Sequence, residues 1–298
     1  MKPFIVRSIS AYHTMTQQGK PTHPLVSVFN FKDMALPQKE MPASIAYDFY
    51  SINLKKNFEG KIRYGQQYYD FDEGVMSFYA PKQVITIEGE ITKIPEGYTL
   101  IVHPDFLQGH PLASKILEYG FFSYAANEAL HLSEREEEMI EGIFESLRQE
   151  INSLTDAHTQ DVVLSHIDLL LSYCNRFYNR QFITRKTANN NLVIQMETVL
   201  NRYFQNNIAG LPTVQYIAQQ LNVSASYLGD MLRYHTGMNT QQHIHNKVIE
   251  KAKELLTTTD MTVAEIAYQI GFEHPQSFNK LFKSKTSQSP LEYRQSFN

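Results

Sequence analysis

TVQYIAQQLNV at Thr213–Val223 and TVAEIAYQIGF at Thr262–Phe272 are two versions of one segment, and they decide the fold of the C-terminal part of this chain. Their matching residues recur at a constant offset of 49. The segments that follow, YLGDMLRYHTG (Tyr227–Gly237) and SFNKLFKSKTS (Ser277–Ser287), match at an offset of 50, so the second copy holds one inserted residue in its turn. Such internal repetition identifies a structural unit that the chain uses twice.

Each copy has the residue pattern of a helix-turn-helix unit. Thr262 and Glu265 form the signature of a capping box at the start of the first helix. An alanine at a close helix approach, a turn residue that tolerates positive φ and an apolar residue then follow in each copy: Ala218, Asn222 and Val223 in the first, Ala267, Gly271 and Phe272 in the second. The pattern predicts units at 213–235 and 262–285.

The second helix of each unit is expected to bury one face and to offer the other to DNA. The apolar faces comprise Leu228, Met231 and Leu232 in one copy and Phe278, Leu281 and Phe282 in the other. The opposite faces are polar and suit a major groove about 12 Å wide. Between the copies, Thr240–Leu256 carries an apolar stripe at helical spacing, and a helix of that length spans roughly 25 Å. Such a connector would hold two recognition helices about one DNA turn, or about 34 Å, apart.

Polar residues of the two second helices are the candidate DNA contacts. They are Ser224, Ala225, Ser226, Gly229 and Arg233 in the first unit and His274, Gln276, Ser277, Asn279, Lys280 and Lys283 in the second. Gln276 or Asn279 can pair with adenine, and Arg233 with guanine or a phosphate. Lys280 and Lys283 are expected to contact phosphates, which position the protein without specifying sequence. The alternative for each residue is a solvated polar face.

The stretch AEIAYQIGFEHPQSFNKLFKSKTSQSPLEYR (Ala264–Arg294) resembles the signature of the AraC/XylS family of transcription regulators, and the resemblance covers about Leu192–Phe297. It implies seven helices containing two helix-turn-helix units. The N-terminal part is similar, without a sharp motif, to the regulatory halves of such proteins, which implies a cupin-like barrel followed by dimerisation helices. Two residues depart from the family pattern: Asp230 stands where a basic residue is common, and Ser287 replaces the usual glycine.

The N-terminal part has a β-rich pattern up to about residue 108, with short strands separated by turn signals that suggest a small barrel or sandwich. Helices follow at about 109–183, one opened by a capping box of Ser133 and Glu136 and one at roughly Asp161–Phe177. The polar stretch 184–191 is the expected linker. The fold class is therefore α+β, with a regulatory domain at 1–183 and an all-α DNA-binding domain at 192–298.

Composition fits a globular protein in the cytoplasm. Hydrophobic residues make up 42% and charged residues 19%, with a net charge of −4. From Asn189 onward, 9 basic residues stand against 8 acidic ones, a net charge of +1. We expect no membrane association, because no apolar run is long enough to span a bilayer, and the N-terminus lacks the pattern of a signal peptide. The single cysteine, Cys174, excludes a disulfide framework.

Catalysis and cofactors are not expected. No nucleophile, phosphate-binding or dinucleotide-binding motif occurs. The histidines of the β-rich region, His13, His23, His103 and His110, form no His-x-His pair, so we expect no metal there. Aromatic residues on the strands can line a ligand pocket, but they more often belong to a core, and the ligand-binding residues stay unknown.

The sequence thus predicts a non-enzymatic, sequence-specific regulator of transcription that binds double-stranded DNA. Further expectations are a small-molecule effector bound by the N-terminal domain, a homodimer and contact with RNA polymerase. Two alternatives stay open. One is a cupin enzyme or metal-binding protein with a helical appendage, which metal in the purified protein would support. The other is a protein that keeps this fold but acts through protein contacts.

Overall fold

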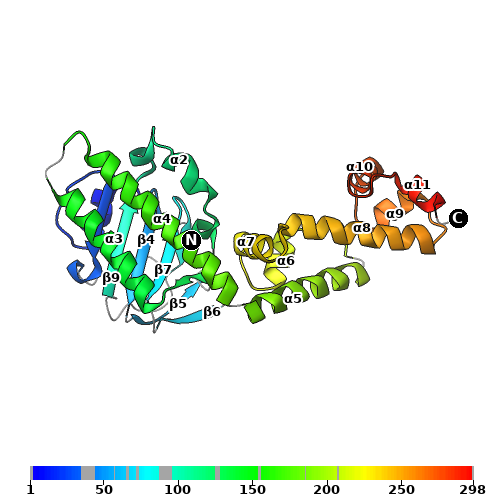
Figure 1. Ribbon diagram of the computed structural model, residues 1–298, viewed down its shortest axis with the longest axis horizontal. Helices are drawn as coiled ribbons and strands as arrows, with labels where there is room; N and C mark the ends of the chain where they lie inside the picture. Colours follow the sequence, from blue (N-terminus) through cyan, green and yellow to red (C-terminus); the bar gives the residue numbers. More distant parts are fainter. Residues whose placement is uncertain are drawn as a thin grey trace. The chain divides into compact units, whose positions relative to one another are not determined.

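The computed structural model describes residues 3–34, 44–56, 58–64, 67–71, 74–86, 96–124, 128–153, 156–184, 186–206 and 208–296. The chain divides into two compact units, Met1–Thr184 and Arg185–Asn298, which are coloured blue to green and green to red in Figure 1. The division falls inside the stretch expected to be a linker. Residues 186–191 of that stretch are helical, so the second unit begins with a helix and not with irregular chain.

The first unit contains the strands that the β-rich pattern predicts. They are β1 (Phe4–Val6), β2 (Val26–Asn30), β3 (Ser44–Tyr47), β4 (Tyr50–Lys56), β5 (Phe58–Tyr64), β6 (Gln67–Phe71), β7 (Val75–Tyr79), β8 (Val84–Thr86), β9 (Glu96–Val102) and β10 (Leu130–His131). They form a five-stranded sheet in the order β10-β7-β4-β9-β2, a three-stranded sheet β1-β3-β8 and the hairpin β5-β6. The described strands do not close into the predicted barrel, because β10 and β2 remain separate edges of the largest sheet.

Alternation along the strands gives the five-stranded sheet two different faces. Val28, Leu100, Ile52 and Phe78 lie side by side across β2, β9, β4 and β7, and all four are buried. The neighbouring row on the other face contains the buried polar residues Thr99 and Asn53, which are hydrogen-bonded to each other. Successive side chains of a strand point to opposite faces, so one register produces both rows.

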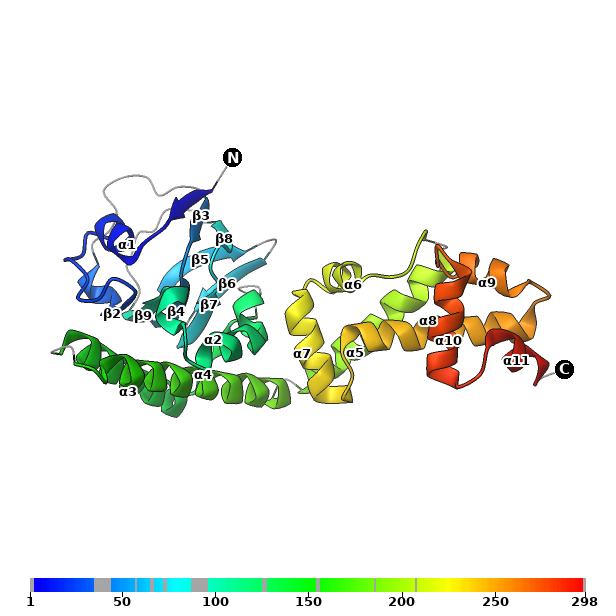
Figure 2. The same ribbon diagram turned by 90° about the horizontal axis from the view of Figure 1, so that it is seen from above.

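Two long helices, α3 (Glu134–Asn152) and α4 (Thr159–Thr184), lie along one side of this sheet in Figure 2. The capping box predicted for α3 is confirmed, with Ser133 N donating to Glu136 Oε2 at 2.9 Å. Helix α4 extends beyond both predicted ends. Its expected apolar face is buried throughout: Val163, Leu164, Ile167, Leu170, Leu171 and Cys174.

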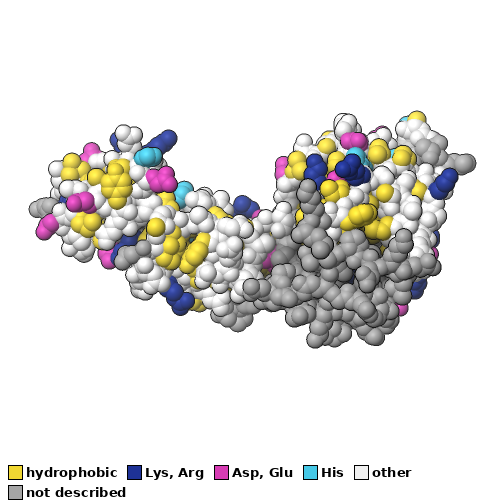
Figure 3. All heavy atoms as spheres, turned by 180° about the vertical axis from the view of Figure 1, so that it is seen from behind, with side chains coloured by type: hydrophobic (Ala, Val, Ile, Leu, Met, Phe, Trp, Pro, Cys, Tyr) yellow, Lys and Arg dark blue, Asp and Glu magenta, His cyan; other side chains and the backbone are white. Residues whose placement is uncertain are grey.

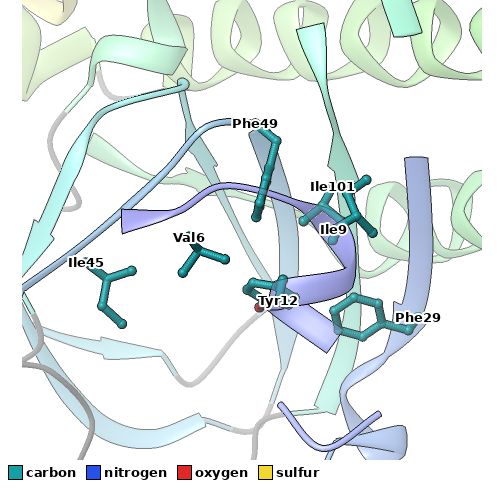
Figure 4. Packing of buried hydrophobic residues seen from close by; sticks show 7 residues of the cluster. All are labelled: Val6, Ile9, Tyr12, Phe29, Ile45, Phe49 and Ile101. Carbon is teal, nitrogen blue, oxygen red and sulfur yellow. The ribbon is translucent and has the colours of Figure 1, made fainter. Parts of the chain in front are cut away.

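The opposite side of the sheet packs against helix α1 (Ile9–Met15) and strands β1 and β3. Figure 4 shows the side chains of this core turned toward one another from several elements, namely Val6, Ile9, Tyr12, Phe29, Ile45, Phe49 and Ile101. The short helix α2 (Leu112–Lys115) completes the α-helices of this unit among the described residues. Burial of these apolar surfaces, at roughly 25 cal/mol per Å², is the main stabilising contribution to such a core.

The described part of the second unit consists of seven helices, the number that the family resemblance implies. They are α5 (Lys186–Gln205), α6 (Val214–Gln220), α7 (Ala225–Thr236), α8 (Thr240–Thr258), α9 (Val263–Gln269), α10 (Pro275–Thr286) and α11 (Pro290–Gln295). Over the described ranges of both units, no helix has the length and apolar character needed to cross a membrane.

Candidate nucleic-acid interface

The two copies of the repeated segment fold into the same hydrogen-bonded turn. Val223 N donates to Ala218 O at 3.1 Å in the first copy, and Phe272 N donates to Ala267 O at 2.9 Å in the second. The turn residue has a positive φ in each case, 56° at Asn222 and 100° at Gly271. The pairs α6–α7 and α9–α10 are therefore two helix-turn-helix units built on one local design, as the repeat predicts.

The second helices of the two units begin differently, and the difference locates the inserted residue. Ser224 caps α7 and accepts a hydrogen bond from Tyr227 N at 3.1 Å. The corresponding His274 makes no side-chain cap, and Pro275 follows it at the first turn of α10. Proline suits that position because its fixed φ matches a helix and its missing N–H would be unpaired there anyway. The additional residue of the second turn is Glu273.

The inward faces of α7 and α10 hold the residues expected there, with one exception. Leu228, Met231 and Leu232 are fully buried in the first unit, and so are Phe278 and Phe282 in the second. Leu281 was expected to be buried as well and is half-buried. The ring centroids of Phe278 and Phe282 lie 5.6 Å apart on the inward side of the helix.

Helix α8 connects the two helix-turn-helix units and packs against both of them. Its predicted apolar stripe is buried along its whole length: Ile244, Val248, Ala252, Leu255 and Leu256. Asn239 caps its first turn by accepting from Gln242 N at 2.9 Å. At the other end Arg294 Nε, from α11, donates to Leu256 O at 3.0 Å. Both ends of the connector are thus satisfied by fixed partners, which favours a rigid rod.

A second connection between the two helix-turn-helix units is made by backbone alone. The segment that leads from α5 to α6 passes the turn of the second unit, where the Gly210 carbonyl group lies directly beside the Cα of Gly271. A Cβ at position 271 would overlap that carbonyl group and would lie 2.9 Å from Leu211 N. Gly271 therefore serves both a positive φ and a close approach of two chain segments.

All six residues expected to contact DNA in the second unit are exposed in the structure. This set comprises His274, Gln276, Ser277, Asn279, Lys280 and Lys283. Gln276, Lys280 and Lys283 follow each other at spacings of four and three residues, so they share one face of α10, opposite Phe278 and Phe282. The structure thus brings these polar residues together on the outward surface of the second recognition helix.

The five residues expected in the first unit are less uniform. Arg233 is exposed, whereas Ser224, Ala225, Ser226 and Gly229 are half-buried. Gly229 faces the start of α8, because a Cβ there would lie 3.8 Å from Thr240 Oγ1. Arg233 Nη1 donates to Asp230 Oδ1 at 2.9 Å, an ion pair that the sequence reasoning did not consider. The spacing of three residues was the signal that could have revealed it.

A contact of α10 with the connector also went unnoticed at the level of sequence. Lys285 Nζ donates to Asn246 Oδ1 of α8 at 3.1 Å, so this lysine is directed toward the protein. It also disfavours protonation of His245, whose pKa is lowered by burial first and by Lys285 second. Burial likewise lowers the pKa of His243, against an opposing effect of Glu197. These two histidines of α8 are therefore neutral at neutral pH and add no positive charge.

Positive charge on the compact unit Arg185–Asn298 is dispersed. On the face seen in Figure 3, lysine and arginine side chains are scattered among acidic and uncharged ones. Within the residues that the structure describes, His, Cys, Asp and Glu side chains do not gather in threes to hold a metal ion. What the geometry offers is a pair of outward helical faces carrying amides, hydroxyls and cations, the groups that hydrogen-bond base edges and phosphates.

A domain with two helix-turn-helix units is thus the class of protein that residues 192–296 define. A family model described as a helix-turn-helix domain matches residues 217–296. The uncharacterized HTH-type transcriptional regulator YijO of Escherichia coli is 26% identical over 43% of this chain and 44% of its own length. The HTH-type transcriptional activator RhaS of Salmonella arizonae is 35% identical over 26% of this chain and 28% of its own length.

Among solved structures, the C-terminal domain of the response regulator yesN from Fusobacterium nucleatum has 30% identity and a TM-score of 0.30, covering 33% of this chain and 96% of that one. The chain spans less than half the length of the two curated relatives that it matches. The helix-turn-helix domain belongs to the AraC/XylS family of transcription regulators, as its signature indicates.

Proposed function

We propose that this protein is a sequence-specific, DNA-binding regulator of transcription. The observation that carries the proposal is the pair of helix-turn-helix units with outward polar faces on α7 and α10. Helix α8 between them has 19 residues and spans about 28 Å, a length comparable to one turn of DNA. Two recognition helices held in this way would enter neighbouring segments of the major groove on one side of a duplex.

The residues of the second unit would divide the work by their position on α10. Gln276 and Asn279 are exposed amides near the start of the helix and would pair with adenine, where a bidentate pair discriminates by about 1–3 kcal/mol. His274 and Ser277 would reach neighbouring base edges. Lys280 and Lys283 would bind phosphates. In the first unit, Ser224, Ala225 and Ser226 open the helix that carries Arg233, and we assign Gly229 to the approach of α7 to α8.

We assign the N-terminal unit a regulatory role, with a small-molecule effector bound between its sheets. Its support is a row of polar residues in the face of the sheet that looks away from α3 and α4, in which Asn53 and Thr99 are buried and Ser77 is half-buried. A cupin-like relationship is part of this proposal. Leu169 and Ile183 are exposed apolar residues of α4, which favours α3 and α4 as a dimerisation segment of a homodimer. RNA polymerase would be the further partner of the DNA-bound form.

The test is a binding titration of the full-length chain with duplex DNA selected from a random pool. We expect affinity to fall steeply with salt, because lysine–phosphate contacts release counterions. Asn279→Ala should weaken binding to the selected site by about 1–3 kcal/mol, whereas Asn201→Ala, an exposed amide on α5, should leave binding unchanged. Failure to select any sequence, or equal behaviour of the two variants, would contradict the proposed function.

A further inference from the structure

The two recognition helices carry opposite charges at one pair of equivalent positions and like charges at another. At the repeat offset of 50, Asp230 corresponds to Lys280, and Arg233 corresponds to Lys283. Helix α10 contains three lysines and no acidic residue, whereas α7 contains one aspartate and one arginine in the same stretch. The first unit therefore gives up the electrostatic attraction that the second unit supplies.

Asp230 lies on the outward face of α7 and not on a side that merely borders it. Ser226, Asp230 and Arg233 are spaced by four and three residues, so they form one stripe. Leu228 and Met231 of the same helix are fully buried on the other side. A carboxylate in this place repels DNA phosphates, so its presence on a DNA-facing stripe requires a compensating role.

The geometry of the ion pair indicates that role. Arg233 Nη1 lies 2.9 Å from Asp230 Oδ1. The carboxylate is the inner partner, with 30% of its side chain exposed, and the guanidinium is the outer one, with 60% exposed. An exposed pair of this kind contributes little to stability. Its effect is to fix the direction of a long side chain, which keeps further N–H donors for other partners.

We propose that Asp230 is a positioning residue that holds the Arg233 guanidinium on the groove-facing stripe of α7, where it reads a guanine instead of binding a phosphate. The inference rests on the proposed function of DNA recognition. Arginine pairs bidentately with guanine O6 and N7, and an arginine that is already oriented loses less side-chain entropy on binding. The first helix-turn-helix unit then adds discrimination of a G·C pair to the base contacts of the second, and the second supplies most of the salt-dependent affinity.

The experiment compares Asp230→Ala, Arg233→Ala and the double variant in the full-length chain, with Lys280→Ala as the matched control at the equivalent position of α10. A site is first selected with the wild-type protein from random duplex DNA. Dissociation constants are then measured for that site, for each single base-pair change and for unrelated DNA, over a series of KCl concentrations. Far-UV circular dichroism checks that each variant keeps its helices.

We expect Arg233→Ala to lose about tenfold or more of the preference for one G·C pair. Asp230→Ala should lose most of the same preference at the same pair, while its affinity for unrelated DNA rises and its salt dependence steepens by up to roughly one phosphate contact. The double variant should discriminate no worse than Arg233→Ala. Lys280→Ala should weaken binding to all sequences alike and reduce the salt slope.

Two results would overturn the positioning role. If Asp230→Ala bound all DNA more tightly with its base preference intact, Asp230 would only repel phosphates. If removing Asp230 erased a base preference that Arg233→Ala retains, Asp230 would read the base itself. Failure of the proposed function would look different, because wild type and Lys280→Ala would then both lack salt-dependent affinity for DNA.

Discussion

Substitution of Gly271 by alanine tests whether the two helix-turn-helix units are held together by backbone contact. Gly271 has a φ of 100°, outside the conformations that residues with a Cβ adopt readily. A strained backbone of this kind costs about 1–3 kcal/mol. The added methyl group would also overlap the Gly210 carbonyl, and relieving an overlap in a packed site costs a further 1–3 kcal/mol or so. We expect Gly271→Ala to destabilise the second helix-turn-helix unit by about 2–6 kcal/mol.

Two matched variants separate the contribution of φ from that of the contact. Gly237 has a φ of 74° and open space around its Cα, so Gly237→Ala should cost only about 1–2 kcal/mol. Asparagine tolerates a left-handed backbone, and Asn222 occupies the equivalent turn of the first unit with a φ of 56°. Gly271→Asn therefore relieves much of the φ penalty but keeps the overlap with Gly210, and it should remain clearly destabilised.

The measurement is urea unfolding of the full-length chain followed by far-UV circular dichroism, since the sequence contains no tryptophan to serve as a fluorescent probe. Because the chain has two compact units, hydrogen exchange of α9 and α10 amides should accompany the urea unfolding. The exchange data assign the transition to the compact unit Arg185–Asn298. If Gly271→Asn were as stable as wild type, or if Gly271→Ala cost no more than Gly237→Ala, the contact between Gly210 and Gly271 would have no energetic weight.

The other predictions concern helix ends in the compact unit Arg185–Asn298. Ser287 adopts a left-handed conformation, with a φ of 63°, at the end of α10. Ser287→Gly should therefore stabilise the domain by roughly 0.5–1 kcal/mol, measured by urea unfolding. A loss of stability would contradict this conformation of Ser287. The backbone N–H and the hydroxyl of Thr262 hold the pKa of Glu265 below its usual range. The stabilisation from this carboxylate should be complete above the ordinary pKa and be lost as pH falls through the lowered value. A carboxyl titration followed by NMR should show the low pKa in wild type and a return toward the ordinary value in Thr262→Ala.

Local features of the compact unit Arg185–Asn298 were predictable because their physical causes are local. The capping box of Thr262 and Glu265, the positive φ of Asn222 and Gly271, and the buried stripe of α8 each depend on residues within a few positions of one another. The repeat then doubled the signal. The contact of Gly210 with Gly271 joins positions 61 residues apart and is made by glycines, so no side-chain pattern could announce it.

The compact unit Met1–Thr184 was less predictable, because the order of its strands depends on contacts between distant residues. Strand positions follow from alternation and turn residues, which are local, but strand order depends on pairing between distant segments. Strand β1 pairs in parallel with β3 in a separate sheet, and β10 joins the edge of the five-stranded sheet from beyond residue 128. A barrel would require the strands to form one closed sheet, whereas these pairings leave β1 and β3 in a separate sheet and β10 at an open edge.

The two copies keep apolar residues at their buried positions, whereas the outward stripes of α7 and α10 differ in chemistry. Ile217 and Ile266 are both fully buried, because a turn of this geometry leaves room for only a few apolar shapes. On the outward stripe, the half-buried Ser226 corresponds to the exposed Gln276 at the offset of 50. The inserted Glu273 also shifts the start of α10 by one residue relative to its turn. The units are therefore one scaffold that presents different chemistry, and a pair of identical DNA half-sites would not suit both of its recognition helices.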